Sequence, residues 1–326
     1  MNKTVRYSLL IFPLILILSA CNPTAAKPAP DTISVRLKWT HGVQFAGLYM
    51  AEQQGFFEEE NLSVTLLEGG LDFDEIDLVA TGQNDFGIVG GPQVLVARGQ
   101  DIPIKAVATI FRIDPAVYFA LTESGIEGPE DFIGKRVIVN PVDAKMSVML
   151  KNAGIDMAQI IEVPPSSDIE IFYNREVDVW GGYITNQVVR ARLDGYELNV
   201  IFPSDYGVHY YGDCFITTER LLQENPDLVE RFLRAAIRGW RYAIENPDEA
   251  VAATLKYFET DDEAFLKASM EAQIPLIHTG VDQIGWMKAK IWQGMYDILL
   301  EQGTLVSSFD LDQIYTMDIL NRIYGK

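Results

Sequence analysis

The sequence predicts an α/β protein built of two lobes with a ligand cleft between them. The first observation behind this class is that strand-like and helix-like patterns alternate from residue 33 to about residue 217. The second is a series of helical patterns from residue 218 onward, as expected when one α/β block is inserted into another and the chain then returns. In addition, 326 residues at 48% apolar composition can supply one or two hydrophobic cores.

The first residues resemble an export signal. Lys3 and Arg6 precede an apolar run over residues 9–20, which is typical of a bacterial signal peptide. This run is too short for a transmembrane helix, which needs about 20 residues. The order Leu-Ser-Ala-Cys that ends at Cys21 resembles a lipobox, in which the cysteine is lipidated. We therefore expect a signal peptide over 1–20, a lipid on Cys21, a tether over 21–31 and an extracytoplasmic protein anchored to the cell membrane.

Charge and cysteine usage exclude several classes of partner and site. The formal net charge is −20, and loss of Lys3 and Arg6 with the signal would make it about −22. Nucleic acid is excluded as a partner, because binding it needs a basic surface. The three histidines have no ligand-type spacing, so we expect no metal site. With Cys21 lipidated, Cys214 is the remaining thiol, and no intramolecular disulfide is possible.

Each expected element has either the period of a strand or that of a helix. The strands are expected at 33–39, 64–67, 85–89, 105–111, 116–122, 136–140, 159–163, 177–181, 198–202 and 208–217. The helices are expected at 43–55, 74–81, 93–98, 141–154, 168–174, 187–194, 226–246, 248–258, 261–272, 282–301 and 309–323.

Turns that lead from a strand into a helix are the candidate ligand contacts. In open α/β sheets, ligands lie outside the carboxyl ends of the strands. The turn from Trp39 to Gln44 has this place, although Trp39 fits a core position equally well. Gly90, Gly91 and Pro92 follow another buried strand, and backbone amides there can hold a carbonyl or an anion, unless the turn is simply tight and empty. Later turns, at residues 140–145 and 182–187, repeat the arrangement.

Several motifs together resemble the NMT1/THI5-like family of periplasmic substrate-binding proteins. The first motif is Trp39-x4-Gln44-Phe45-Ala46-Gly47-Leu48-Tyr49, followed by Gly55-Phe56-Phe57. Two inner motifs are residues 81–87 and 181–186. The C-terminal half contributes residues 211–213, 225–226, 238–240 and 245–247. The resemblance implies a periplasmic-binding-protein type II fold with two crossover strands near residues 118 and 212. It implies one lobe over 32–118 plus 213–326, a second lobe over 119–212, and closure on a small ligand. Such proteins are monomers that deliver the ligand to the permease of an ABC importer.

Departures from the family pattern favour a neutral ring as the ligand. Members that bind the aminopyrimidine precursor of thiamine carry an Asp before the Trp, an Asn-His pair after it, and a Glu in the second-lobe turn. This chain has Lys38, Gln44 with Phe45, and Gln187 at those places. An amide can both donate and accept, as the imide edge of an isoalloxazine requires. Riboflavin is therefore favoured as the transported ligand, with no cofactor, and formylaminopyrimidine is the alternative.

The residues expected to contact the ligand combine flat rings with small polar groups. Aromatic side chains gather near the expected cleft, and flat heterocycles stack on them. Asp205 could bond sugar-like hydroxyls, or it could cap a turn. The predicted contacts are Trp39, Gln44, Gly91, Asn140, Tyr183, Asn186, Gln187, Asp205, Tyr206 and Tyr210.

Two other functional classes are weaker. Yeast-type members of the family are pyrimidine synthases that consume a histidine of their own and need a cysteine-rich motif. Here Phe45 stands where that histidine is expected and Cys214 is isolated, so we expect no enzyme. An alkanesulfonate or nitrate binder would use the amides of 90–93 with Lys38 or Lys145.

Overall fold

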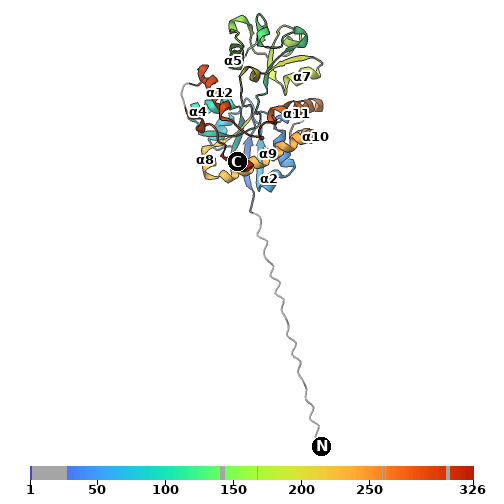
Figure 1. The fold of residues 1–326 in the computed structure, drawn as a ribbon. Coiled ribbons are helices and arrows are strands. Elements are labelled where there is room, and N and C mark those ends of the chain that lie inside the picture. The colour runs from blue at the N-terminus through green and yellow to red at the C-terminus, as the bar shows by residue number, and fades with distance from the viewer. Residues whose placement is uncertain (2–27, 140–143, 167, 259, 261, 306–308) are drawn as a thin grey trace.

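The computed structural model describes Met1 and residues 28–139, 144–166, 168–258, 260, 262–305 and 309–326. Within these ranges the chain forms two α/β parts, which lie one above the other in Figure 1. The lower part in that view contains both the first strands and the C-terminal helices, and the upper part contains the middle of the chain. The predicted signal peptide, its cleavage site and Cys21 lie outside the described residues.

The larger part contains a five-stranded sheet in the order β2-β1-β3-β10-β4. Strand β1 (Asp31–Arg36) pairs in parallel with β2 (Leu62–Leu67) and β3 (Phe86–Val89). Strand β10 (Cys214–Thr218) pairs antiparallel with both β3 and β4 (Ile104–Thr109). Every residue of β3 and β10 is buried, which explains why both sequences are apolar or small.

Short helices connect these strands. After β1, the expected helix forms as a 3₁₀ turn over Val43–Phe45 that continues into α1 (Ala46–Gln53). The others are α2 (Phe56–Glu59), α3 (Glu75–Ala80) and α4 (Gly91–Gly99). The expected strand-to-helix turns at the carboxyl ends of β1 and β3 are therefore confirmed, and they place Lys38 and Gln93 at the same edge of the sheet.

The smaller part has its own sheets and its own core. Strand β5 (Ala116–Leu121) pairs antiparallel with β8 (Trp180–Tyr183) and β9 (Leu198–Ile201), and β6 (Arg136–Ile138) pairs in parallel with β7 (Ile161–Val163). Its helices are α5 (Ala144–Asn152), α6 (Glu170–Tyr173) and α7 (Gln187–Leu193). A separate cluster of buried side chains, among them Phe119, Phe172 and Trp180, fills the interior.

Two chain passages join the parts, and they lie side by side. The first leaves β4 and enters β5, and the second leaves β9 and enters β10. The amide of Gly212 donates to the carbonyl of Phe111 at 2.8 Å, and the amide of Ile110 donates to the carbonyl of Asp213 at 2.7 Å. The lobe boundaries expected near residues 118 and 212 stay a prediction, and Tyr118 itself pairs within the smaller sheet.

The C-terminal helices cover the larger sheet, as expected. They are α8 (Glu219–Glu224), α9 (Pro226–Glu245), α10 (Pro247–Thr254), α11 (Glu263–Ile277), α12 (Ala289–Glu301) and α13 (Asp318–Tyr324). The predicted cap of α9 is present, because the side chain of Asn225 accepts from the amide of Leu228. Helix α9 crosses α1 where glycines allow close approach: a Cβ on Gly47 would lie 2.2 Å from the ring of Trp240.

Several expected boundaries were wrong, two of them because pairing with β4 overrides the local pattern. Residues 282–288 are not helical; Gly285 instead accepts from the amide of Thr109 in β4. The segment before α13 runs beside β4, where the carbonyl of Ile314 accepts from Ala106 at 2.8 Å. Strand β8 begins at Trp180, three residues after its expected start, and β10 begins only at Cys214, after the second connecting passage. Within the described ranges, each helix is too short or too polar to span a bilayer.

Candidate functional site

A cavity of about 660 Å³ lies where the two parts meet. The larger part contributes Lys38 from the end of β1 and Gln93 from the first turn of α4, and the smaller part contributes Lys145 and Tyr183. The connecting passages contribute Asp114 and residues 210–212. This size falls within the range of roughly 300 to 1,000 Å³ that is usual for small-molecule sites.

One ion pair belongs to the larger part. Lys38 Nζ lies 3.1 Å from Asp213 Oδ1, and Gln44 Nε2 donates to Asp213 Oδ2 at 2.6 Å. Burial is the largest single effect and lowers the pKa of Lys38, but Asp213, Tyr183 and Asp114 together outweigh burial and raise it. Lys38 therefore stays an ammonium whose charge is already balanced by a carboxylate that is 3% exposed.

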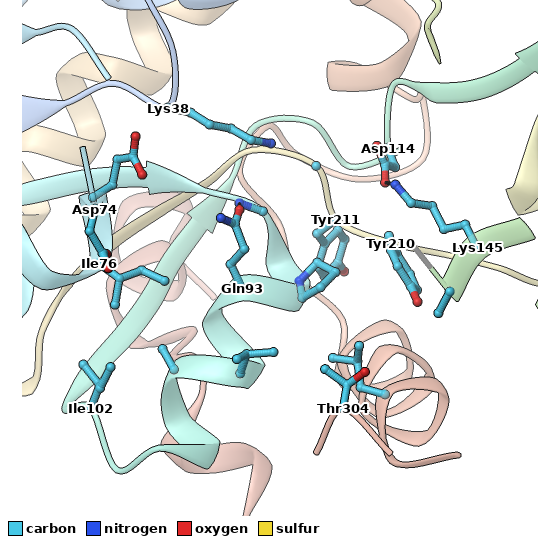
Figure 2. A pocket seen from close by; sticks show the side chains of 18 of the residues that line it. Lys38, Asp74, Ile76, Gln93, Ile102, Asp114, Lys145, Tyr210, Tyr211 and Thr304 are labelled. Carbon is cyan, nitrogen blue, oxygen red and sulfur yellow. Dashed lines mark hydrogen bonds and ion pairs between the residues drawn. The ribbon is translucent and has the colours of Figure 1, made fainter. Parts of the chain in front are cut away.

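A second ion pair crosses from the first connecting passage to the smaller part. Lys145 Nζ lies 2.9 Å from Asp114 Oδ2, and the amide of Ala116 donates to Asp114 Oδ1 at 3.0 Å. Burial is the largest single effect and raises the pKa of Asp114, yet the Lys145 ammonium, the amide of Ala116 and Lys38 together lower it. The ammonium also lies 5.6 Å from the centre of the Tyr210 ring. Figure 2 shows this pair on the same polar edge of the cavity as Lys38, whose ammonium extends toward Asp114.

The amides at the start of α4 have acceptors within the protein, which agrees with the alternative of a tight turn rather than with amides open to a ligand. The amide of Gly90 donates to Gln93 Oε1 at 2.8 Å, and the amide of Gly91 donates to the carbonyl of Tyr211 at 3.0 Å. Pro92 has no amide hydrogen, and the amide of Gln93 donates back to Gly90. The side chain of Gln93 lies between Lys38 and Tyr211 (Figure 2).

Aromatic rings enter the cavity from both parts. Tyr183 at the end of β8 and Phe73 before α3 line it and are 36% and 44% exposed. Tyr210 and Tyr211 come from the second connecting passage and are buried. The Tyr211 hydroxyl accepts from the amide of Lys288 at 2.7 Å, so this ring also holds the segment that precedes α12.

Two of the predicted contacts, Tyr183 and Tyr210, line the cavity. Three other predicted contacts, Gln44, Gln187 and Gly91, use their polar groups in hydrogen bonds to other residues of the protein. Gln44 is bonded to Asp213, Gln187 Oε1 accepts from the amide of Tyr183 at 2.8 Å, and the amide of Gly91 is bonded to Tyr211. These three do not line the cavity.

Four further predicted contacts, Trp39, Asn186, Asp205 and Tyr206, are not among the residues that line the cavity. Trp39 is 48% exposed, Asn186 and Asp205 are exposed, and the Tyr206 hydroxyl lies near Gly128. Asn140, like Cys21, lies outside the described residues. Whether any of these residues contacts a ligand stays a prediction.

Sequence reasoning missed Asp114, Phe73 and the side chain of Gln93, and it considered Lys38 and Lys145 for an anion only. Asp114 had a usable signal, because it lies two residues before the strand that begins at Ala116, near the expected lobe boundary. Phe73 had none, since it follows an edge strand in a polar loop. In the part of the chain that the structure describes, no group of three or more acidic, His or Cys side chains is placed to hold a metal ion.

Similar proteins agree with this architecture. A formylaminopyrimidine-binding protein of Halalkalibacterium halodurans is 29% identical, covering 74% of this chain and 76% of its own. The riboflavin-binding protein RibY of Chloroflexus aurantiacus is 24% identical, covering 94% and 95%. A Legionella pneumophila protein named 4-amino-5-hydroxymethyl-2-methylpyrimidine phosphate synthase is 29% identical, covering 67% and 71%, so the relatives include a named enzyme.

The solved structures show the same fold. The periplasmic aliphatic sulphonate binding protein SsuA of Escherichia coli superposes with a TM-score of 0.70, covering 87% of this chain and 91% of that one, at 14% identity. This protein therefore has the periplasmic-binding-protein fold that the sequence predicts. The NMT1/THI5-like family model matches residues 43–250. On this match, the chain belongs to the NMT1/THI5-like family.

Proposed function

We propose that this protein is the substrate-binding lipoprotein of an ABC importer and that it captures a small planar heterocyclic vitamin, with riboflavin favoured. The observation that carries the proposal is the cavity between the two parts, in which aromatic rings from both parts surround ammonium groups that are already neutralised. A flat, uncharged ligand meets stacking surfaces there without leaving a buried charge unbalanced.

The charge arrangement supports a neutral ligand. Each cavity ammonium has a carboxylate within 3.1 Å, Lys38 with Asp213 and Lys145 with Asp114. An anion would compete with these carboxylates, and a cation would compete with the ammonium groups. A neutral ring that offers both hydrogen-bond donors and acceptors can bond to the ammonium and carboxylate groups while the two ion pairs stay intact.

The stacking surfaces support a planar ligand. Tyr183 and Phe73 are exposed aromatic side chains from different parts, and both line the cavity. Each aromatic pair contributes about 0.5 to 1.5 kcal/mol beyond the area that it buries. Arg36 lies 4.6 Å from the Phe73 ring and supports its position.

Full-length similarity to the riboflavin-binding protein RibY also supports a flavin. Formylaminopyrimidine is the second candidate, since a protein named for binding it is 29% identical. The observation in its favour is Asp114, a cavity carboxylate that can accept hydrogen bonds from an amino group. Its pairing with Lys145 weakens this preference.

An alkanesulfonate or nitrate is the least supported ligand. The amides of Gly90 and Gly91 already have acceptors, and Lys38 and Lys145 already have carboxylates. Binding an anion there would require these bonds to break. The likeness to SsuA concerns the fold, and its ligand does not transfer at 14% identity.

The absence of catalysis is part of the proposal. Phe45, at the place of the histidine that the yeast-type synthases consume, is 1% exposed. Cys214 is buried in β10, and burial raises the pKa of its thiol to about 12, so it is a poor nucleophile at neutral pH. Export and lipidation at Cys21 would hold such a receptor beside its permease, outside the cytoplasm.

Spectroscopy and thermal shifts test the proposal. Protein purified from a flavin-containing host is expected to carry a flavin absorbance band, and unfolding it should release riboflavin. A thermal-shift panel of riboflavin, formylaminopyrimidine, taurine and nitrate then ranks the ligands, because a ligand at 100 times its Kd adds about 2.7 kcal/mol. Stabilisation by taurine or nitrate alone would contradict the proposal, and stabilisation by formylaminopyrimidine alone would select the second candidate.

A further inference from the structure

The cavity has two halves of different chemistry. One half contains the charged and amide groups of Lys38, Asp114, Lys145 and Gln93. The other half is lined by aliphatic side chains of α3, α4, the loop after α4 and α12, with Asp74, Glu75, Gln100 and Thr304 beside them. The aliphatic side chains are Ile76, Val96, Ala97, Ile102 and Leu299. Figure 2 shows Ile76 below Asp74 and Ile102 farther from Lys38 and Asp114, with Gln93 and the two tyrosines between Ile102 and Asp114.

Helix α4 sets the length of this surface. Gln93, Val96, Ala97 and Gln100 all line the cavity, and their spacing of three, four and seven residues places them on one face of the helix. At 1.5 Å per residue, this face extends for about 10 Å. A single pyrimidine ring is shorter than the face, whereas a fused tricyclic ring extends along it from the amide end to the aliphatic end.

Three of the five aliphatic side chains leave part of their surface open, whereas Ala97 and Leu299 are buried. Ile76, Val96 and Ile102 are only partly buried, although they pack against the core of the larger part. Two acidic groups at its edge have partners, since Asp74 accepts from the amide of Asp77 at 2.9 Å and Glu75 accepts from the amide of Gly70 at 3.4 Å. Covering exposed aliphatic surface is favourable at roughly 25 cal/mol per Å². A ligand with an apolar edge would gain this contribution in addition to its polar bonds.

We infer that the aliphatic half is a subsite for an apolar fused ring of the ligand, and that the side chains of Val96 and Ile102 select ligands that carry such a ring. This inference rests on the proposed function and narrows it. The hydrogen-bonding edge of the ligand lies toward Gln93 and the two ion pairs, and the apolar ring lies along α4. A dimethylbenzene ring joined through a central pyrazine ring to a pyrimidinedione has this division of polarity.

A matched pair of ligands tests the inference. Riboflavin and 6,7-dimethyl-8-ribityllumazine share the pyrimidinedione edge and the ribityl chain, but the lumazine lacks the dimethylbenzene ring. The wild-type protein should bind riboflavin more tightly, and Val96→Thr should weaken riboflavin binding roughly fivefold while leaving lumazine binding unchanged. Val64→Thr, on the partly buried face of β2 and remote from the cavity, is the control and should change neither affinity.

The outcomes of this experiment distinguish failure of the subsite from failure of the proposed function. Equal effects of Val96→Thr on both ligands, or tighter binding of the lumazine by the wild type, would overturn the subsite and leave the proposed function standing. If neither ligand binds while formylaminopyrimidine does, the subsite is overturned and the second candidate ligand is selected. If none of the three binds, the proposed function fails and the subsite fails with it. Thermal unfolding of both variants verifies that their folds are intact.

Discussion

Asp213→Asn is expected to destabilise the fold by about 2 to 3 kcal/mol, because Lys38 would lose its counter-charge. Asp213 is 3% exposed and accepts from both Lys38 and Gln44. Breaking a fully buried ion pair costs about 3 to 5 kcal/mol. The Lys38 side chain is 22% exposed, so water offsets part of this cost.

The unfolding entropy is about 2.1 cal/mol/K per residue. For a chain of 326 residues, a loss of 1 kcal/mol in stability therefore lowers the Tm by about 1.5 °C. The expected fall in Tm for Asp213→Asn is roughly 3 to 5 °C. Urea unfolding followed by tryptophan fluorescence measures the free energy directly. The double variant Lys38→Met/Asp213→Asn should be more stable than Asp213→Asn alone, since it removes the unbalanced ammonium as well. Unchanged stability in Asp213→Asn, or simple additivity in the double variant, would refute the reasoning.

The same pair predicts a loss of stability in alkali. The pKa of Lys38 is higher in the folded state than the ordinary value of 10.5. A group of this kind contributes its full stabilisation below the unfolded pKa, and this contribution is lost as the pH rises through the folded pKa. Stability should therefore decline above about pH 10.5. The decline should be smaller in Lys38→Met, and equal declines in the two proteins would show that other groups, such as tyrosines, cause it.

Trp39→Ala should change the free energy of unfolding by less than about 1 kcal/mol, because the side chain is half exposed. The same substitution should weaken ligand binding measured by titration, and equal losses of stability and of binding would mean that Trp39 belongs to the core. Cys21→Ser should move the protein from the membrane to the soluble fraction with unchanged affinity, and retention on membranes would contradict lipidation. Arg190 of α7 lies 2.6 Å from Asp262 and 4.6 Å from the Phe265 ring, so it links the two parts. Arg190→Gln should raise the ligand dissociation rate in stopped-flow experiments by about threefold. The change is modest because solvent screens the ion pair between Arg190 and Asp262. An unchanged rate would mean that this ion pair has no role in closing the two parts around the ligand.

Most strands and helices were predictable because their patterns are local. The alternation of Ile33, Val35 and Leu37 appears as β1, and the spacing of Val43, Ala46 and Met50 appears as the 3₁₀ turn and α1. Boundaries failed where the chain meets a distant strand edge. Residues 282–288 have an acceptable helical pattern, yet they lie against the first connecting passage, where Arg112 bonds to Thr279 and Asp282.

The polar contacts of the site were less predictable, because a polar side chain contacts whichever partner the fold brings nearest. Gln44 and Gln187 have the residue type that a neutral ring requires. The fold instead places an acceptor, Asp213, beside Gln44 and a donor, the amide of Tyr183, beside Gln187. The aromatic predictions were more successful for Tyr183 and Tyr210, because both lie at the strand ends or connections that a cleft between two lobes must use.

The sequence by itself determined the α/β class, the NMT1/THI5-like resemblance and the positions of most elements, since each depends on neighbouring residues and their periodicity. Only the tertiary structure decided which side chains share the cavity. Lys38, Asp114, Lys145 and Tyr210 are far apart in the chain, and they meet because parallel strand ends and two adjacent connecting passages converge at one place. Charge balance there depends on distances of about 3 Å, which no spacing in the sequence specifies.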